Sequence, residues 1–395
     1  MKIYTSKKDI ASAKAIIADD MMLTVDMPTA AGSKMLDGYM SLIEAEALTR
    51  AKNAGYELVG KTDVGEFAID LVGETSYNGA IVKDGALKNA TAEALIAGDA
   101  VAAICLDVNG APRRAAAQSG LVSIKPTYGT VSRYGVIPVA CSGECVSVMS
   151  KSASACRELL GAIVGHDDKD GTSLCDELCG SVKANETKIS RVAVITSMKK
   201  GIDASVEAKI ESAKAIFEKS GIEVALIDDE IIDKARAAWN ILMSAELCNN
   251  VSRYDGVKYG YRAQNFSGID ELYTNSRTEA FGILLKKAIL FGSDTLSTEN
   301  YMKVYDKALR TRRVIVERFA EIFAQFDAVM IPACSTMDYA ENTSEEMAYE
   351  ENFYTAPATI AGLPAVVVGG VQLVGKAFSD GALLGAAELL EKEGK

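Results

Sequence analysis

The strongest constraint on the fold is the alternation of short apolar segments with helical segments along most of this 395-residue chain. The clearest unit has an apolar segment at 192–196, a helical pattern at 203–220 that stops before Gly221, and a second apolar segment at 222–227. Such a unit predicts two parallel strands joined by a right-handed helical crossover. Four apolar residues recur on one side of this helix: Val206, Ile210, Ala213 and Phe217.

The same two periodicities predict the other elements. Strands are expected at 57–62, within 137–150, at 328–332 and within 365–375, and helices at 40–54, 90–105, 152–164, 298–325 and 380–393. Neither a repeat nor a low-complexity linker interrupts them. The pattern favours an α/β fold in a single domain over residues 1–395, with a mixed central β-sheet covered by helices on both faces. Residues 1–30 are weakly patterned and are interpreted as a shortened N-terminal segment.

Charge and composition exclude several classes of protein. The formal net charge of −12 argues against a broad surface for direct nucleic-acid contact. No apolar run reaches the roughly 18 residues that a membrane span needs. The N-terminus lacks the apolar core of a signal peptide, so we expect a cytoplasmic protein without membrane contact. The eight cysteines form no C-x-x-C pair and His166 is the single histidine, so neither a metal nor a cofactor is expected.

Two short motifs suggest chemistry that their surroundings do not support. Residues 55–62 match the P-loop expression, but a helix precedes Gly55 and an apolar strand fills the variable positions, so we interpret the match as chance. A phosphate site requires the opposite order, with the strand first and a helix opening at the lysine. His166 lies in the acidic loop 165–173, where a solvated side chain is a better interpretation than a general base.

Several segments in collinear order carry a more specific signal. They are TAAGSKML (29–36), GKTDVGEFA (60–68), GLVSIKPTYGTVSRYG (120–135), GHDDKDGTS (165–173), RYDGVKYGYR (253–262) and TAPATIAGLPAVVV (355–368). Together they resemble the amidase signature family, in particular the A subunit of the glutamyl-tRNA(Gln) amidotransferases. The resemblance spans nearly all of the chain after residue 30. It implies the amidase signature fold, in which helices wrap a mixed central sheet.

The resemblance also implies a catalytic apparatus that this sequence does not retain. In that family a neutral lysine accepts a proton, through a serine held on a cis peptide bond, from a second serine that attacks the amide. The lysine position falls on Lys61, but the first serine falls on Leu87 and the nucleophile on Ala111. Alanine has no nucleophilic atom and leucine cannot relay a proton. We therefore also expect a trans peptide bond before Leu87, because a cis bond costs about 3 kcal/mol.

The nucleophile's turn keeps part of its pattern. Asp107, Gly110 and Arg113 match the family, and we expect Asp107 and Arg113 to form a salt bridge that braces the turn. The positions whose backbone N–H groups would face an oxyanion are Val108, Asn109, Gly110 and Ala111. Lys61 has either a ligand-binding role or a structural one, and for the structural role Asp63 or Glu66 is the expected partner.

Positions that hold the substrate are altered as well. In the family an aspartate binds the α-amino group of glutamine, and this position falls on Asn352. An arginine pair, of which one member is expected to bind the α-carboxylate, falls on Lys287 and Ala288. The sequence therefore predicts a degenerate substrate site in addition to the degenerate catalytic one.

Three functional hypotheses follow from these substitutions. The first is an amidase-like pseudoenzyme that has lost amide hydrolysis and acts as a binding or assembly component, with a small-molecule ligand, a partner subunit of the amidotransferase type or a second copy of itself. The second is an active amidase or glutaminase whose nucleophile is Cys105 or Cys145, activated by Lys61. The third is a non-catalytic subunit of an amidotransferase-like complex.

Overall fold

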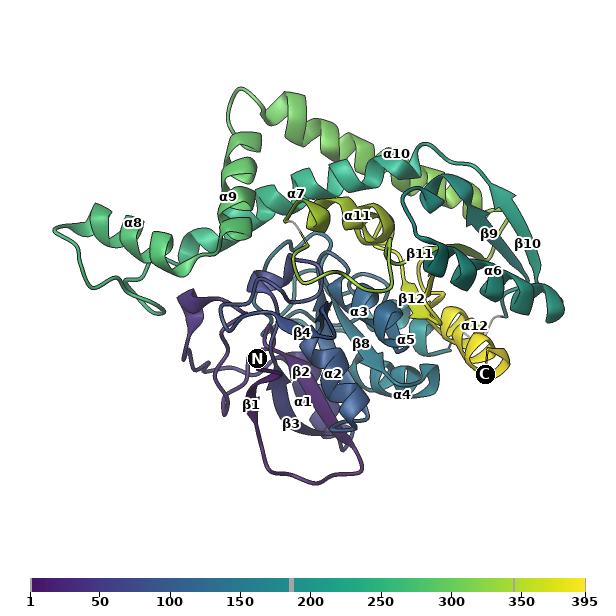
Figure 1. Ribbon diagram of the computed structural model, residues 1–395, viewed down its shortest axis with the longest axis horizontal. Helices are drawn as coiled ribbons and strands as arrows, with labels where there is room; N and C mark the ends of the chain where they lie inside the picture. Colours follow the sequence, from purple (N-terminus) through teal and green to yellow (C-terminus); the bar gives the residue numbers. More distant parts are fainter. Residues whose placement is uncertain (1, 185–187, 344, 395) are drawn as a thin grey trace.

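The computed structural model describes residues 2–184, 188–343 and 345–394. Its centre is an 11-stranded mixed sheet, built from the described residues in the order β1-β3-β2-β6-β8-β7-β12-β13-β11-β9-β10 (Figure 1). The strands are β1 (Tyr4–Lys7), β2 (Ala15–Asp19), β3 (Glu57–Thr62), β6 (Ala102–Asp107), β7 (Val122–Lys125), β8 (Cys145–Ser150), β9 (Arg191–Ile195), β10 (Glu223–Ile227), β11 (Ala328–Pro332), β12 (Ala365–Val368) and β13 (Val371–Gly375). Parallel pairs lie near both ends of the sheet and antiparallel pairs join them, which confirms the predicted mixed α/β fold.

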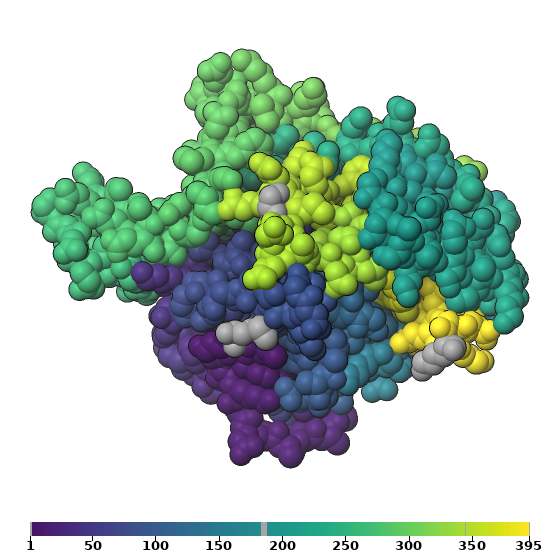
Figure 2. All heavy atoms as spheres, viewed as in Figure 1, coloured from purple at the N-terminus to yellow at the C-terminus, as the bar shows by residue number. Residues whose placement is uncertain are grey.

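Helices cover both faces of this sheet. They are α1 (Glu46–Asn53), α2 (Ala90–Ala97), α3 (Ala111–Ser119), α4 (Ala153–Ile163), α5 (Asp176–Ala184), α6 (Ala204–Lys219), α7 (Ala235–Asn250), α8 (Ile269–Ala280), α9 (Ile283–Thr295), α10 (Asp306–Phe323), α11 (Glu345–Ile360) and α12 (Asp380–Glu393). Figures 1 and 2 show the segment around α8 projecting from the body of the molecule. In the part of the chain that the structure describes, no helix combines the length and the apolar character that a membrane crossing requires.

The predicted strand–helix–strand unit is confirmed. Strands β9 and β10 pair in parallel, with Val192 opposite Val224, and α6 connects them. Asp203 caps the helix by accepting hydrogen bonds from the N–H groups of Ser205 and Val206. The four apolar residues expected on the inner side of α6 are all buried. Local pattern and tertiary packing therefore agree in this unit.

The region that precedes the turn at 107–113 differs from the sequence prediction. The helix expected over 90–105 ends at Ala97, because Gly98 adopts a left-handed conformation with φ +86° and caps it. The rest of that segment forms β6, which lies inside the sheet. The weakly patterned residues 1–30 contain β2, whose five residues are buried between β3 and β6. Both strands are continuous apolar runs, which periodicity does not distinguish from a buried helix.

Two helices begin later than expected. Helix α1 starts at Glu46 rather than residue 40, and Met40 is 49% exposed. Helix α10 starts at Asp306, after a π-helical turn at Tyr301–Tyr305. Met302, within this π-helical turn, is 63% exposed. By contrast, β3, β11 and α12 have the predicted bounds.

Candidate functional site

The turn at the nucleophile position connects the end of β6 to the start of α3. Asp107 is the last residue of the strand and Ala111 is the first residue of the helix. Gly110 has φ +85°, and a Cβ atom there would lie 2.4 Å from the side chain of Thr355, so both conformation and space require glycine. Ala111 is 6% exposed and Val108 is fully buried. The turn therefore places the methyl group of Ala111, rather than a hydroxyl, at the N-terminus of α3.

Arg113 braces this turn from inside the molecule. Its guanidinium group donates two hydrogen bonds to the carboxylate of Asp107, at 2.7 and 2.9 Å, which confirms the predicted salt bridge. It also donates to the side chains of Gln372 and Thr359 and to the carbonyl of Thr355. Burial raises the pKa of Asp107, but the charge and hydrogen bonds of Arg113 outweigh burial, so this pKa lies below its ordinary value. Asp107 therefore remains ionised.

The adjacent Arg114 is a structural residue that the sequence analysis missed. Its guanidinium group is buried and donates to the carbonyls of Leu71, Asn109 and Asp70 and to the hydroxyl of Thr355. The available signal was a pair of arginines within a run of alanines, which lacks the polar residues of an exposed helical face. Together the two arginines tie the turn to the loop after β3 and to α11.

The side chain of Asn109 is held at both ends. Its Nδ2 donates to the carbonyl of Ile69 at 2.9 Å, and its Oδ1 accepts a hydrogen bond of 2.8 Å from Nε1 of Trp239. Its backbone carbonyl accepts from the Thr355 hydroxyl at 2.8 Å. These bonds fix the orientation of the Asn109 side chain, which therefore helps to order the turn.

Leu87 lies in a hairpin outside the large sheet. Strand β4 (Ile81–Lys83) pairs with β5 (Ala86–Lys88), and Leu87 is opposite Val82. The side chain is 3% exposed, and the backbone N–H donates to the carbonyl of Tyr339 at 2.8 Å. The peptide bond entering Leu87 is trans, as expected. Leu87 thus contributes an apolar contact at the position where the family resemblance implies a serine.

Lys61 is fully buried near the end of β3, and it bonds to residues that follow β2 in the chain. Its amine forms an ion pair of 2.7 Å with Oδ1 of Asp20, and it donates hydrogen bonds to Oγ1 of Thr29 at 2.5 Å and to the carbonyl of Pro28 at 2.9 Å. The parallel pairing of β2 with β3 brings Asp20 beside the lysine. The role of this side chain is therefore decided by a contact between neighbouring strands.

The partners that the sequence suggested for Lys61 were wrong. The carboxylate of Asp63 accepts hydrogen bonds from the side chain of Ser76, and that of Glu66 accepts one from Ser33. Sequence proximity favoured Asp63 and Glu66, whereas the carboxylate that pairs with the lysine is 41 positions away in the chain, at residue 20.

The amine of Lys61 is enclosed by three oxygen atoms. It donates two hydrogen bonds, to Thr29 and Pro28, and it forms an ion pair with the carboxylate of Asp20. Among the described residues, its hydrogen bonds and ion pair all go to residues 20–29, and none reaches Leu87 or the turn at 107–113. Burial lowers the pKa of Lys61, and Asp20 opposes this effect. Burial also raises the pKa of Asp20.

The cysteines that could replace the serine are protonated and enclosed. Cys105 is 2% exposed, and burial together with the charges of Asp19 and Asp107 raises its pKa well above the ordinary value. Cys145 is 4% exposed, and burial raises its pKa although Lys125 opposes the shift. Neither thiol is poised to ionise.

Other polar groups show no arrangement typical of a metal site or a catalytic histidine. His166 stays in its acidic loop, with Nε2 beside Asp168 at 2.9 Å and Nδ1 beside the carbonyl of Leu174 at 2.9 Å. Within the residues that the structure describes, histidine, cysteine and carboxylate side chains form no cluster that could hold a metal ion.

The three positions expected to bind substrate meet in one cavity of about 150 Å³, together with Asn109 of the turn. Lys287 and Ala288 come from α9 and Asn352 comes from α11. The Lys287 amine forms an ion pair of 2.5 Å with Glu345 at the more exposed edge. Asn352 is 2% exposed, and its Oδ1 has no hydrogen-bond partner among the described residues. The cavity thus joins the predicted substrate positions to the turn, without including Lys61.

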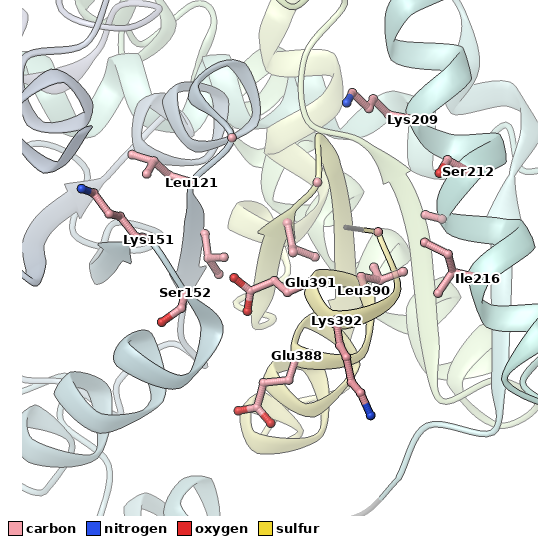
Figure 3. Close-up of a pocket in the computed structure, with 16 residues that line it drawn as sticks. Leu121, Lys151, Ser152, Lys209, Ser212, Ile216, Glu388, Leu390, Glu391 and Lys392 are labelled. Carbon is pink, nitrogen blue, oxygen red and sulfur yellow. The ribbon is translucent and has the colours of Figure 1, made fainter. Parts of the chain in front are cut away.

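A larger cavity, of about 600 Å³, lies elsewhere (Figure 3). It is bordered by α6 and α12, with Lys151, Lys209 and Lys392 around it. Glu391 accepts a hydrogen bond from the Ala153 N–H, and Glu388 pairs with Arg157, so these carboxylates have structural partners. None of the predicted site residues lines this cavity.

A mixed sheet wrapped by helices, with a braced strand-to-helix turn beside a small cavity, defines the class of protein. A family profile described as Amidase matches residues 18–384, which is most of the chain. The chain belongs to the amidase family, which confirms the resemblance inferred from the sequence.

Individual proteins of known name are similar to this chain over most of its length. The A subunit of glutamyl-tRNA(Gln) amidotransferase from Lachnoclostridium phytofermentans is 34% identical over 409 residues, covering 95% of this chain and 82% of that protein. The corresponding protein of Coxiella burnetii (strain Dugway 5J108-111) is 34% identical over 400 residues, covering 96% and 83%. The crystal structure of the corresponding Thermotoga maritima protein has a TM-score of 0.80 at 26% identity, covering 98% of this chain and 87% of that one. 6-Aminohexanoate cyclic dimer hydrolase, at 17% identity and a TM-score of 0.78, shares the fold.

Proposed function

We propose that this chain is an amidase-family protein that does not hydrolyse amides and acts as a binding or assembly component. One observation carries the proposal: the first residue of α3, at the position assigned to the nucleophile, is Ala111. A methyl group cannot attack a carbonyl carbon. The backbone N–H groups of a helix N-terminus can stabilise an anion, but stabilisation without a nucleophile produces no acyl-enzyme.

The environment of Lys61 supports the same proposal. A lysine that acts as a base must be neutral and must have a lone pair directed at the proton it accepts. The amine of Lys61 instead donates hydrogen bonds to Thr29 and Pro28 and pairs with the carboxylate of Asp20. To serve a nucleophile it would have to turn away from all three of these groups. We therefore assign Lys61 a structural role at the end of β3.

The retained residues favour a function that needs the scaffold. Arg113 and Arg114 connect the turn to Gln372, Thr355 and Leu71 through buried hydrogen bonds. This network holds the turn in place whether or not chemistry occurs there. The relatives compared above are named as one subunit of an amidotransferase, and such a name supports a partner subunit for this chain too.

The second candidate function is hydrolysis by Cys105 or Cys145. The observation in its favour is that both cysteines lie beside the turn. Cys105 is in β6, and Cys145 is opposite Asp107 in the antiparallel pairing of β8 with β6. Burial and raised thiol pKa values count against it, because the thiolate is the reactive form.

The test is the release of ammonia from L-glutamine, L-asparagine and acetamide by the purified chain, with an active amidase assayed in parallel. We expect no turnover above the uncatalysed rate. Turnover that disappears in Lys61→Ala would overturn the proposal and restore Lys61 as a catalytic group. Turnover that disappears in Cys105→Ala or Cys145→Ala, and on thiol alkylation, would establish the cysteine enzyme instead.

A further inference from the structure

We propose that the 150 Å³ cavity between α7, α9 and α11 binds a small uncharged molecule that carries one hydrogen-bond donor on an apolar body. This inference rests on the proposed function, because it names the class of ligand for a protein that binds without hydrolysing. The cavity is lined by Ile69, Asn109, Asn240, Met243, Ser244, Leu284, Lys287, Ala288, Phe291, Glu345, Ala348, Tyr349 and Asn352.

The hydrogen-bonding group that requires a ligand is the side chain of Asn352. It is 2% exposed, and among the described residues its Oδ1 has no hydrogen-bond partner. Buried polar atoms are normally paired, and an unpaired carbonyl oxygen destabilises the fold. Glu345, Ala348, Tyr349 and Asn352 occupy positions i, i+3, i+4 and i+7 of α11, so one face of this helix borders the cavity. An N–H or O–H group of a ligand would satisfy the orphaned oxygen.

The charges of the lining argue against an ionic ligand. Among the described residues, Lys287 and Glu345 are the only charged side chains of the lining, and they form a 2.5 Å ion pair at its exposed edge, where their side chains are 59% and 34% exposed. A charged group placed against the buried Ile69, Met243 and Asn352 would have no partner of opposite charge beside it. A zwitterionic amino acid such as glutamine would meet the same obstacle. The amide of Asn109 carries no charge, and both of its ends are oriented by hydrogen bonds to the protein.

The size of the cavity limits the apolar body. About 150 Å³ is the size of a protein cavity known to accept benzene, and it is below the roughly 300 Å³ that drug-sized ligands need. Ile69, Met243, Leu284 and Phe291 supply apolar contact around such a group. The structure therefore favours a single ring or a short branched chain with one hydroxyl or N–H group.

A matched probe series tests this assignment on the full chain. Toluene, benzyl alcohol, benzoate and benzylammonium share one ring and differ in donor and charge, and L-glutamine represents the zwitterion. Binding is measured by ligand-observed NMR titration and by calorimetry. We expect benzyl alcohol to bind saturably at one site, at least about tenfold more tightly than each of the other four probes. Tighter binding of benzoate, benzylammonium or L-glutamine, or no saturable binding of benzyl alcohol, would overturn the inference.

Variants identify the site. Asn352→Leu keeps the volume but removes the acceptor, so it should weaken benzyl alcohol at least tenfold and leave toluene unaffected. Asn249→Leu is the matched control, since Asn249 is an exposed residue of α7 outside the cavity, and should change neither affinity. Ala288→Leu, on a partly exposed helix face, should prevent the binding of both probes by filling the cavity. If Asn352→Leu does not fold, Ala288→Leu decides whether the probes bind in this cavity. Unchanged benzyl alcohol binding in the folded variants contradicts the site.

Ammonia release separates this inference from the proposed function. Amide turnover together with intact benzyl alcohol binding would refute the proposed function and leave the ligand site standing. Absence of both turnover and benzyl alcohol binding would refute the ligand site and leave the proposed function standing.

Discussion

Two buried pairs of opposite charge, Lys61 with Asp20 and Arg113 with Asp107, lie at the ends of neighbouring strands and behave differently. In both pairs each side chain is fully buried. Burial raises the pKa of Asp20 above its ordinary value. Burial acts on Asp107 in the same direction, but Arg113 overcomes it, and the pKa of Asp107 falls below its ordinary value.

The difference follows from the chemistry of the two cations. A guanidinium group stays protonated and can donate to both oxygens of a carboxylate at once, as Arg113 does. An ammonium group lacks the planar fork that matches both oxygens of one carboxylate, and burial lowers the pKa of Lys61. The turn is therefore held by a permanently ionised pair, whereas the pair at β2 and β3 can adjust its protonation. Three measurements would break or sharpen this contrast.

The largest expected effect is that of Arg113→Met. The substitution leaves Asp107 ionised and unpaired in the interior, so it should lower the free energy of unfolding by about 3–5 kcal/mol in urea titrations. The control is Arg313→Met on the exposed side of α10, where Arg313 pairs with Glu317 and little change is expected. A small loss in Arg113→Met, equal to that of the control, would show that the turn does not depend on this pair.

The second-largest expected effect is a dependence of the free energy of unfolding on pH, which arises from Glu66, a residue that follows β3. Burial raises the pKa of Glu66 to about 7, although Ser33 and the Gly282 N–H oppose the shift. A carboxyl group whose folded pKa is raised stabilises the fold fully below its unfolded pKa, near 4.3, and loses this contribution as the pH rises through about 7. Glu66→Gln, whose amide can bond to both partners, should remove on the order of 2–3 kcal/mol of the decline in stability between pH 4.5 and 8.

At the turn, the dependence of stability on pH has the opposite sign. The lowered pKa of Asp107 gives stability that is present above its unfolded pKa and is lost as the pH falls through the folded one.

The Glu66 prediction is checked by urea titrations of the parent protein and of Glu66→Gln between pH 4.5 and 8, which give the free energy of unfolding of each at every pH. Parallel stability curves for the two proteins would refute the assignment of the raised pKa to Glu66.

The smallest expected effect is that of Lys61→Met. Because the pKa of Asp20 is already raised, its carboxyl group can take up a proton when the lysine is removed, so the loss at pH 6 should be only about 1–2 kcal/mol. Adding Asp20→Asn should then change stability little. A loss as large as that of Arg113→Met would mean that this pair is as firmly ionised as the one at the turn.

Sequence patterns predicted the elements whose periodicity is local. Helix α12 has the predicted bounds, and the unit β9–α6–β10 has both its parallel pairing and its buried stripe. Strands β2 and β6 were missed because they are buried on both faces and carry no alternation. The helix expected over 298–325 is divided into a π-helical turn at Tyr301–Tyr305 and α10 from Asp306, a boundary that apolar spacing does not mark.

In the candidate site, too, the contacts within one local unit were predictable and the contacts between distant segments were not. The braced turn was predictable, since Asp107 and Arg113 are six residues apart and belong to one strand–turn–helix unit. The partner of Lys61 was not, because Asp20 reaches it through the pairing of β2 with β3. The substrate positions were identified one by one, but their meeting in a cavity with Asn109 depends on how α9 and α11 pack.

The amino-acid order alone establishes which functional groups exist: a methyl group at 111, an isobutyl group at 87 and an amide at 352. Folding establishes what those groups face, such as the three acceptors around the Lys61 amine and the unpaired oxygen of Asn352. The reason is physical. Chemical identity is a property of one residue, whereas burial, ionisation and hydrogen bonding depend on neighbours that only packing brings within a few ångströms.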